Sequence, residues 1–175
     1  MKLLLHACCA DCTLKFLESA KTEDLETTIY YYNPNIHPRA EYTARLKAMQ
    51  QITTENKVKI IVPDWKPKEY FKEINDQSER PNRCIRCWNL RLGITAKFAS
   101  ENGFDIFSST LISSQYQDWK KIEEIAVNMA KKYKINFWRP ETINCDLKTS
   151  GFYKQFFCGC VYSMKERYEE KYKVK

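Results

Sequence analysis

Glycine is scarce in this chain, and long apolar runs are missing. Only 4 of the 175 residues are glycine, and none belongs to a G-x-G-x-x-G or G-x-x-x-x-G-K pattern of the kind that cradles nucleotide phosphates. Nucleotide hydrolysis is therefore not expected. No stretch approaches the roughly 20 apolar residues of a membrane span, and the first apolar run is too short for a signal peptide. We therefore expect a cytoplasmic protein.

Cysteine, in contrast, is abundant. The chain has 8 cysteines, and cytosolic proteins seldom form disulfides, so metal binding or redox chemistry is the usual explanation. A net charge of +7 favours an anionic macromolecule as partner, although a solvated lysine-rich surface would give the same charge. The length and the hydrophobic content of 43% suit one domain, residues 1–175, with its own core.

Strand-like and helical segments alternate along the chain. Apolar or β-branched runs predict strands, and apolar stripes at spacings of three and four predict helices. The strands are expected at 2–6, 26–32, 58–62, 104–111 and 135–138. Helices are expected from residue 13 and at 39–56, 67–74, 87–100, 119–133 and 162–172. The alternation predicts an α/β fold, a Rossmann-like parallel sheet of about five strands flanked by helices, with its site at the C-terminal strand ends.

Seven cysteines fall in three tight clusters that are far apart in sequence. Cys8, Cys9 and Cys12 lie in a strand-to-helix turn, where backbone N–H groups and the helix dipole favour thiolates. The other two clusters are the pairs Cys84 with Cys87 and Cys158 with Cys160. Gly159 permits the backbone angles of a tight C-x-C turn. Folding is expected to assemble a shared metal site, whereas Cys145 stands alone and is expected to be an ordinary buried residue.

The number of thiols exceeds what one simple metal site uses. A structural zinc site and a cubane iron–sulfur cluster each take four thiolates. The thiols left over favour a second metal or a redox role, and Asp11, in the first cysteine turn, is a possible oxygen ligand. Two alternatives stay open: a zinc-stapled fold with spare buried cysteines, and a thioredoxin-like dithiol, which would need only one C-x-x-C pair.

Several stretches together resemble one family. They are His6–Cys12, Tyr32–Pro38 with Glu41, Tyr42 and Arg45, Arg83–Leu92, Ser109–Gln117 and Phe157–Ser163. From residue 3 to about residue 163 the chain resembles the cobalamin-independent epoxyqueuosine reductases of the QueH type. The resemblance implies a domain like those of the nucleotide α-hydrolases without their phosphate loop. It also implies a 4Fe–4S cluster with an additional mononuclear iron close by, and a possible role for Asp146.

The resemblance implies reduction of epoxyqueuosine to queuosine in tRNA, with loss of the epoxide oxygen as water. The electrons would come from an external ferredoxin- or flavodoxin-like donor, and the additional iron is expected to act as a Lewis acid on the leaving oxygen. Candidate proton donors are Asp11, His37 and Tyr116. His6 ends a buried strand and is expected to be hydrogen-bonded structure.

Polar residues near these motifs are expected to contact the tRNA. Arg83, Arg86 and Arg91 flank the second cysteine pair and could hold phosphates, which position RNA without specifying its sequence. The residues expected to read the modified base are Asn33, Asn35, Ser113, Ser114 and Gln117. That base, at the first anticodon position, would have to leave the stack to enter a recessed pocket.

Two other functions stay open from the residues. A zinc-stapled RNA-binding module without catalysis would also be basic and rich in clustered cysteines, but its preparations would be colourless. A sulfur-transfer enzyme acting on tRNA would require ATP, and the missing phosphate loop counts against it. The leading hypothesis remains an iron–sulfur reductase that acts on tRNA.

Overall fold

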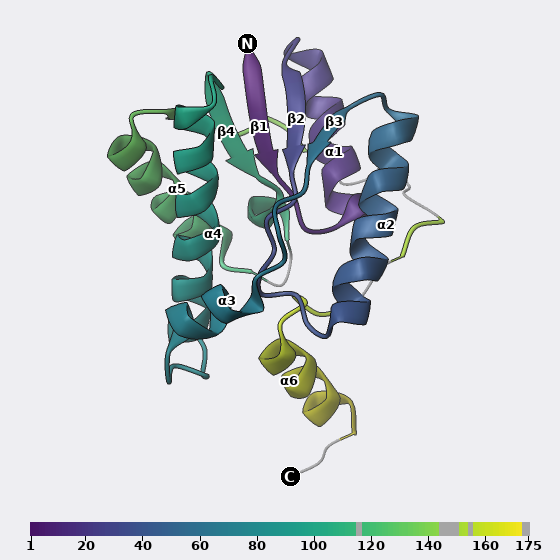
Figure 1. Ribbon diagram of the computed structural model, residues 1–175, viewed down its shortest axis with the longest axis vertical. Helices are drawn as coiled ribbons and strands as arrows, with labels where there is room; N and C mark the ends of the chain where they lie inside the picture. Colours follow the sequence, from purple (N-terminus) through teal and green to yellow (C-terminus); the bar gives the residue numbers. More distant parts are fainter. Residues whose placement is uncertain (115–116, 144–150, 154–155, 173–175) are drawn as a thin grey trace.

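The computed structural model describes residues 1–114, 117–143, 151–153 and 156–172 (Figure 1). In this part of the chain, five strands form one parallel sheet in the order β3-β2-β1-β4-β5. The strands are β1 (Lys2–His6), β2 (Glu26–Tyr30), β3 (Lys59–Ile61), β4 (Ile106–Ser109) and β5 (Asn136–Phe137). This order is that of a doubly wound, Rossmann-like sheet. The predicted α/β fold is confirmed.

The described helices cover both faces of the sheet. They are α1 (Ala10–Thr22), α2 (Arg39–Glu55), α3 (Pro67–Ile74), α4 (Asn82–Glu101), α5 (Trp119–Tyr133) and α6 (Val161–Tyr172), with a short 3-10 helix η1 (Thr110–Ser113) after β4. Figure 1 shows α1 and α2 on one side of the sheet, α4 and α5 on the other, and α6 beyond the C-terminal strand ends. None of the helices in the described ranges is long and apolar enough to cross a membrane.

The leucines of β1 explain why both faces of the sheet are covered. Successive side chains of a strand point to opposite faces. Leu3 and Leu5 pack in the core that includes Phe16 of α1 and Met49 of α2. Leu4 belongs to the opposite core, which includes the buried residues of α4 and α5. All three leucines are fully buried, as is typical of a parallel strand with helices on both sides.

Some elements begin or end at other residues than predicted. β2 stops at Tyr30, just before a loop in which two prolines cannot donate to a strand ladder. β4 stops at Ser109, because its side chain accepts a hydrogen bond from the backbone N–H of Leu111 (3.2 Å) and starts η1. Helix α4 begins at Asn82, earlier than expected, so the second cysteine pair lies inside its first turns.

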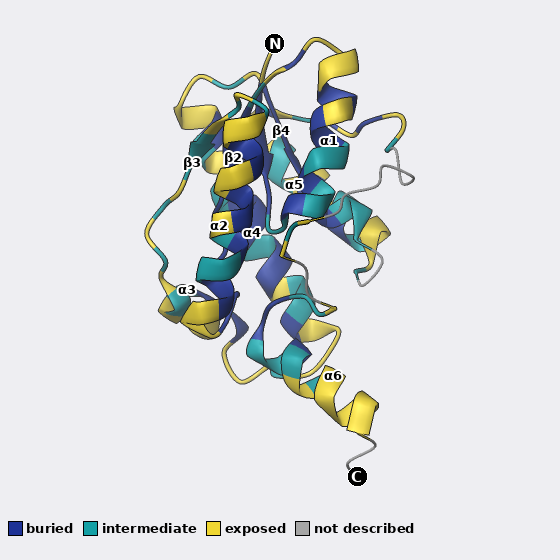
Figure 2. Ribbon diagram, turned by 90° about the vertical axis from the view of Figure 1, so that its right-hand side faces the viewer, coloured by how far each residue is buried: buried dark blue, intermediate teal, exposed yellow. Residues whose placement is uncertain are grey.

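Helix α6 is attached to the rest of the domain mainly through the segment before it. Of its residues only Ser163 is buried, and Figure 2 shows exposed residues toward its far end. Gly159, just before α6, has a φ of +110°, and a Cβ there would lie 3.1 Å from a side-chain carbon of Ile36 and 3.2 Å from Nη1 of Arg45. The expectation of unusual backbone angles at this glycine is confirmed.

Replacing Gly159 by alanine is expected to lower the free energy of unfolding by about 2–4 kcal/mol, because it combines backbone strain with steric overlap. Gly103→Ala is the matched control. Gly103 also has a positive φ (+72°) but open space around its Cβ position, so it should lose only about 1 kcal/mol. Urea unfolding of the metal-free proteins measures both, and equal losses would contradict the close approach at Gly159.

Candidate metal centre

The second and third cysteine clusters, which are both pairs, lie in the wall of one narrow pocket at the C-terminal end of the sheet. Cys84 and Cys87 come from the start of α4, and Cys158 and Cys160 from the segment before α6. The remaining lining residues are Asn35, Tyr70, Arg80, Arg83, Trp88, Gln117 and Ser163. Folding thus brings together two thiol pairs that are far apart in sequence. We call this space the thiol pocket.

The first cysteine cluster lies in the turn between β1 and α1. Cys9 is the N-cap of α1, and its thiol shares hydrogen bonds with the sulfurs of Cys8 and Cys12. These hydrogen bonds lower the pKa of Cys8 and of Cys12, while they raise the pKa of Cys9. The turn therefore favours thiolates at Cys8 and Cys12, and the largest cause is the hydrogen bond with the thiol of Cys9.

Arg91 connects the first cluster with the thiol pocket. Its guanidinium is fully buried and interacts electrostatically with Cys8, Cys87 and Cys158. Its Nη2 donates to Oδ1 of Asn33 (2.7 Å), whereas Nε and Nη1 have no hydrogen-bond partner among the described residues. A buried cation is costly unless an anion lies close by. The position of Arg91 therefore favours negative charge on the surrounding sulfurs.

Burial acts in the opposite direction on the thiols of the pocket. It raises the pKa of Cys84, Cys87 and Cys158 above that of a free thiol. Without a metal these side chains are therefore neutral thiols, and a soft metal would have to displace their protons in order to bind. The thiolates formed on metal binding would place further negative charge beside Arg91.

The described thiols do not form a closed ligand set. No group of three or more cysteine, histidine, aspartate or glutamate side chains in the described ranges is arranged closely enough to hold a metal ion. The donor chemistry nevertheless suits an iron–sulfur group, because thiolates are its usual ligands and buried arginines surround them. Asn35 adds a fully buried amide that lines the pocket and has no partner among the described residues.

The two histidines have different surroundings. Nδ1 of His6 lies 2.7 Å from Oγ of Ser109, and its Nε2 lies 3.1 Å from the carbonyl oxygen of Tyr32. Burial lowers the pKa of His6, so the expectation of a hydrogen-bonded structural residue is confirmed. His37 is buried against the ring of Phe71, with ring centroids 4.8 Å apart. It does not belong to the lining of the thiol pocket.

The expected phosphate contacts of two arginines need correction. Arg83 is 2% exposed and Arg91 is 0% exposed, so neither lies where an RNA backbone can reach it. Arg83 instead forms an ion pair with Glu166 (2.7 Å). Only Arg86 of the three is exposed. Charge near a cysteine pair suggested RNA contacts, but the physical role of the buried arginines is to face thiols and an acidic residue of α6.

The residues expected to read the base occupy several environments. Asn33 is buried and donates from Nδ2 to the carbonyl oxygen of Ala7 (2.8 Å), so it stabilises the backbone just after β1. Ser113 donates to the carbonyl oxygen of Thr110 (2.9 Å) and also hydrogen-bonds Cys12. Ser114 follows η1 directly and is half-buried.

One of the remaining candidates is described by the structure and three are not. Asp11 occupies the first turn of α1, next to the first cysteine cluster. Tyr116, Cys145 and Asp146 lie outside the described residues.

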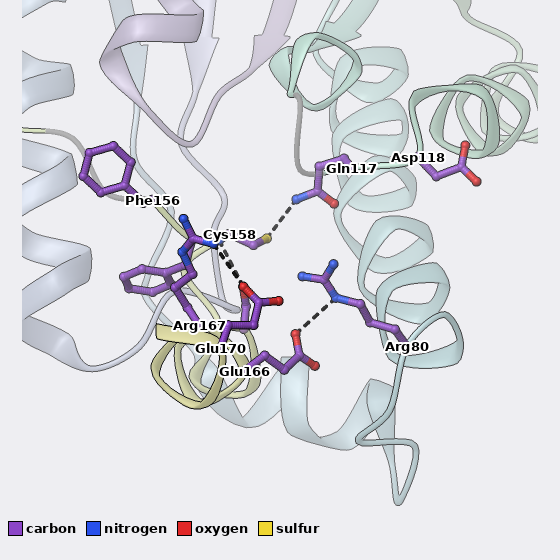
Figure 3. Close-up of a pocket in the computed structure, with 10 residues that line it drawn as sticks. Arg80, Gln117, Asp118, Phe156, Cys158, Glu166, Arg167 and Glu170 are labelled. Atoms are coloured by element: carbon purple, nitrogen blue, oxygen red, sulfur yellow. Dashed lines mark hydrogen bonds and ion pairs between the residues drawn. The ribbon is translucent and has the colours of Figure 1, made fainter. Parts of the chain in front are cut away.

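A larger cavity of about 670 Å³ opens beside the thiol pocket, between the starts of α4 and α5 and helix α6 (Figure 3). We call it the α6 cavity. Arg80, Gln117, Cys158 and Ser163 line both spaces. Ion pairs join Arg80 to Glu166 (3.2 Å) and Arg167 to Glu170 (3.0 Å) at its rim. The sequence predicts that the C-terminal helix helps to complete the site, and Ser163, Glu166, Arg167 and Glu170 of α6 line this cavity.

A family model described as "Epoxyqueuosine reductase QueH" matches residues 3–166. The chain belongs to the QueH family. A relative from Dehalococcoides mccartyi, named epoxyqueuosine reductase QueH, is 36% identical over 174 residues, which cover 95% of this chain and 94% of the relative. A relative of the same name from Histophilus somni is 34% identical over 178 residues, covering 94% and 73%. The resemblance inferred from the motifs is confirmed.

A solved structure supports the fold of this QueH family member. The predicted subunit of a tRNA methyltransferase from Methanocaldococcus jannaschii superposes with a TM-score of 0.54 at 12% identity, covering 80% of this chain and 69% of the other. At this identity the similarity concerns the arrangement of strands and helices. The cysteine clusters must be interpreted from the present chain itself.

The pKa shifts predict different reactivities in the reduced, metal-free protein. Cys12 and Cys84 are both half-buried, but the pKa of Cys12 is lowered and that of Cys84 is raised. Iodoacetamide at pH 7 should therefore alkylate Cys12 at least about tenfold faster, since thiolates are the reactive form. The Cys12 rate should also level off at lower pH. Mass spectrometry of peptides gives both rates.

The Cys9→Ala variant serves as the control for this measurement. It removes the hydrogen bond that contributes most to the lowered pKa of Cys12, so Cys12 should react more slowly while Cys84 keeps its rate. Equal rates for the two thiols in the wild-type protein would contradict the described hydrogen bonding in the first turn.

Proposed function

We propose that this protein reduces epoxyqueuosine to queuosine in tRNA, the last step of queuosine biosynthesis. The observation that carries the proposal is the shared wall between a thiol-lined pocket and an open cavity, in a member of the QueH family. The α6 cavity has the volume of a small-ligand site, and Cys158 lies in that wall. A nucleoside bound in the cavity would therefore lie beside Cys158, which also lines the thiol pocket.

We infer that the clustered cysteines hold a 4Fe–4S cluster and an additional iron. The residues proposed for these roles are Cys8, Cys9, Cys12, Cys84, Cys87, Cys158 and Cys160, with Asp11 as a possible oxygen ligand. A cubane takes four thiolates, which leaves thiols for a second centre. When bound, such a group supplies the electrons for the reduction. In this proposal residues 1–175 act as one catalytic domain, and the Cys158–Cys160 segment together with the C-terminal helix completes the site.

The proposed reduction requires a source of electrons and a source of protons. Removing the epoxide oxygen breaks two C–O bonds, forms a C=C bond and releases water, which consumes two electrons and two protons. An external ferredoxin- or flavodoxin-like protein would provide the electrons. Among the proposed proton donors, neither Asp11 nor His37 lines the thiol pocket or the α6 cavity, and Tyr116 lies outside the described residues. All three are kept as candidate donors in this proposal.

The rim of the α6 cavity has the side chains that a flipped nucleotide requires. Phe156 is 62% exposed and lines the cavity, so a base can stack on its ring. The side chains of Arg80 and Arg167 are about half exposed, and both lie at the same rim, where phosphates can compete for their carboxylate partners. The net charge of +7 favours RNA in the same way.

Anaerobic reconstitution with iron and sulfide tests the function. We expect a brown protein with broad absorption near about 400 nm, as is typical of iron–sulfur charge transfer. With a strong reductant it should convert epoxyqueuosine in tRNA to queuosine, seen in digested nucleosides by mass spectrometry as the loss of one oxygen atom. A colourless protein that binds only zinc and RNA would instead identify a zinc-stapled binding module.

Alanine at Cys84 or Cys158 should remove the absorption near about 400 nm and abolish the reduction, because each substitution takes a soft ligand from the proposed centre. The Cys145→Ala variant is the control, since Cys145 lies outside the three cysteine clusters. It should keep the iron content of the wild-type protein. Full iron and activity in the Cys84 or Cys158 variant would exclude that thiol from the centre.

A further inference from the structure

The side chain of Gln117 lies between the two spaces of the site. It lines the thiol pocket and the α6 cavity alike. Its Nε2 is 3.0 Å from Sγ of Cys158, a hydrogen bond drawn as a dashed line in Figure 3, and its Oε1 is 2.9 Å from Nε1 of Trp88. Both ends of the amide are thus engaged inside the protein. This arrangement differs from the expected role of Gln117 in reading the modified base.

The indole of Trp88 determines which way round the amide lies. An indole N–H can only donate a hydrogen bond, so the atom of Gln117 that faces it must be the oxygen. The NH₂ group therefore faces Cys158 and approaches its sulfur as a donor. Trp88 is 5% exposed and packs in the core that includes Leu92 and Ile122. The donor that orients the amide is thus itself held in place.

We propose that Gln117 is a positioning residue whose amide donates a hydrogen bond to the Cys158 sulfur when that sulfur ligates iron, and so raises the reduction potential of the centre. The inference rests on the proposed function, because it requires iron at Cys158. Hydrogen bonds to cluster sulfurs are among the factors that set the potential. A donor stabilises the more negative, reduced form, and it does so strongly where water is excluded.

The decisive variant is Gln117→Leu, reconstituted anaerobically and titrated electrochemically with detection by electron paramagnetic resonance. We expect an unchanged iron content, a more negative midpoint potential and altered g values, because the donor to sulfur is lost. Gln117→Glu should shift the midpoint in the same direction and further, since a carboxylate cannot donate and adds negative charge. Gln51→Leu is the matched control, because Gln51 donates only to Glu55 on the exposed face of α2. It should leave the midpoint unchanged.

A second variant tests the orienting role of the indole. Trp88→Phe keeps Gln117 but removes the group that fixes its amide, so part of the same negative shift is expected. Thermal unfolding followed by circular dichroism establishes that the variant is folded before its potential is compared.

Two results would overturn the inference, and they are distinguishable. If Gln117→Leu keeps the wild-type midpoint and g values while its affinity for tRNA falls, Gln117 reads the substrate and this inference alone fails. If the wild-type protein takes up no iron–sulfur cluster under reconstitution, the proposed function fails together with it.

Discussion

The buried guanidinium of Arg91 is the constraint around which the C-terminal edge of the sheet is organised. Arg91 lies one helical turn after Cys87 on α4. It interacts electrostatically with one thiol from each of the three cysteine clusters, namely Cys8, Cys87 and Cys158. Through Asn33 it is also connected to the carbonyl group of Ala7 at the end of β1. Such a cation is stable inside a protein only beside negative charge. Thiolates that ligate iron would provide that charge, so the fold and the proposed chemistry depend on the same group.

The segment that carries the third cysteine pair is held from two sides. Arg45, itself in a buried ion pair with Glu41, donates to the carbonyl oxygens of Phe157 (3.1 Å) and Cys158 (3.3 Å). The backbone N–H of His37 donates to the carbonyl oxygen of Gly159 (2.8 Å). On the other side, Arg83 pairs with an acidic residue of α6. Groups from α2, the β2–α2 loop and α4 thus place these thiols.

The sheet and the cysteine clusters could be predicted from the sequence, whereas the environment of the thiols could not. Apolar runs such as Leu3–Leu5 and the alternation of strands and helices specify a parallel sheet locally. Arg83 and Arg91 flank the second cysteine pair and were therefore expected to hold phosphates, but both are buried. Charged side chains are seldom buried without a partner. Their partners are thiols and a carboxylate from distant segments of the chain, and no local sequence pattern predicts such partners. The α6 cavity could not be predicted for the same reason, since its walls come from segments that are far apart in the sequence.

The position of the Cys158–Cys160 segment in the chain has a consequence for biosynthesis. Among the described residues the last strand is β5, which ends at Phe137, so the sheet can form before this segment leaves the ribosome. Until then the nascent domain carries five clustered thiols at 8–12 and 84–87 with one wall of their pocket missing. If the proposed centre uses all three cysteine clusters, its full ligand set exists only after residue 160 has been synthesised.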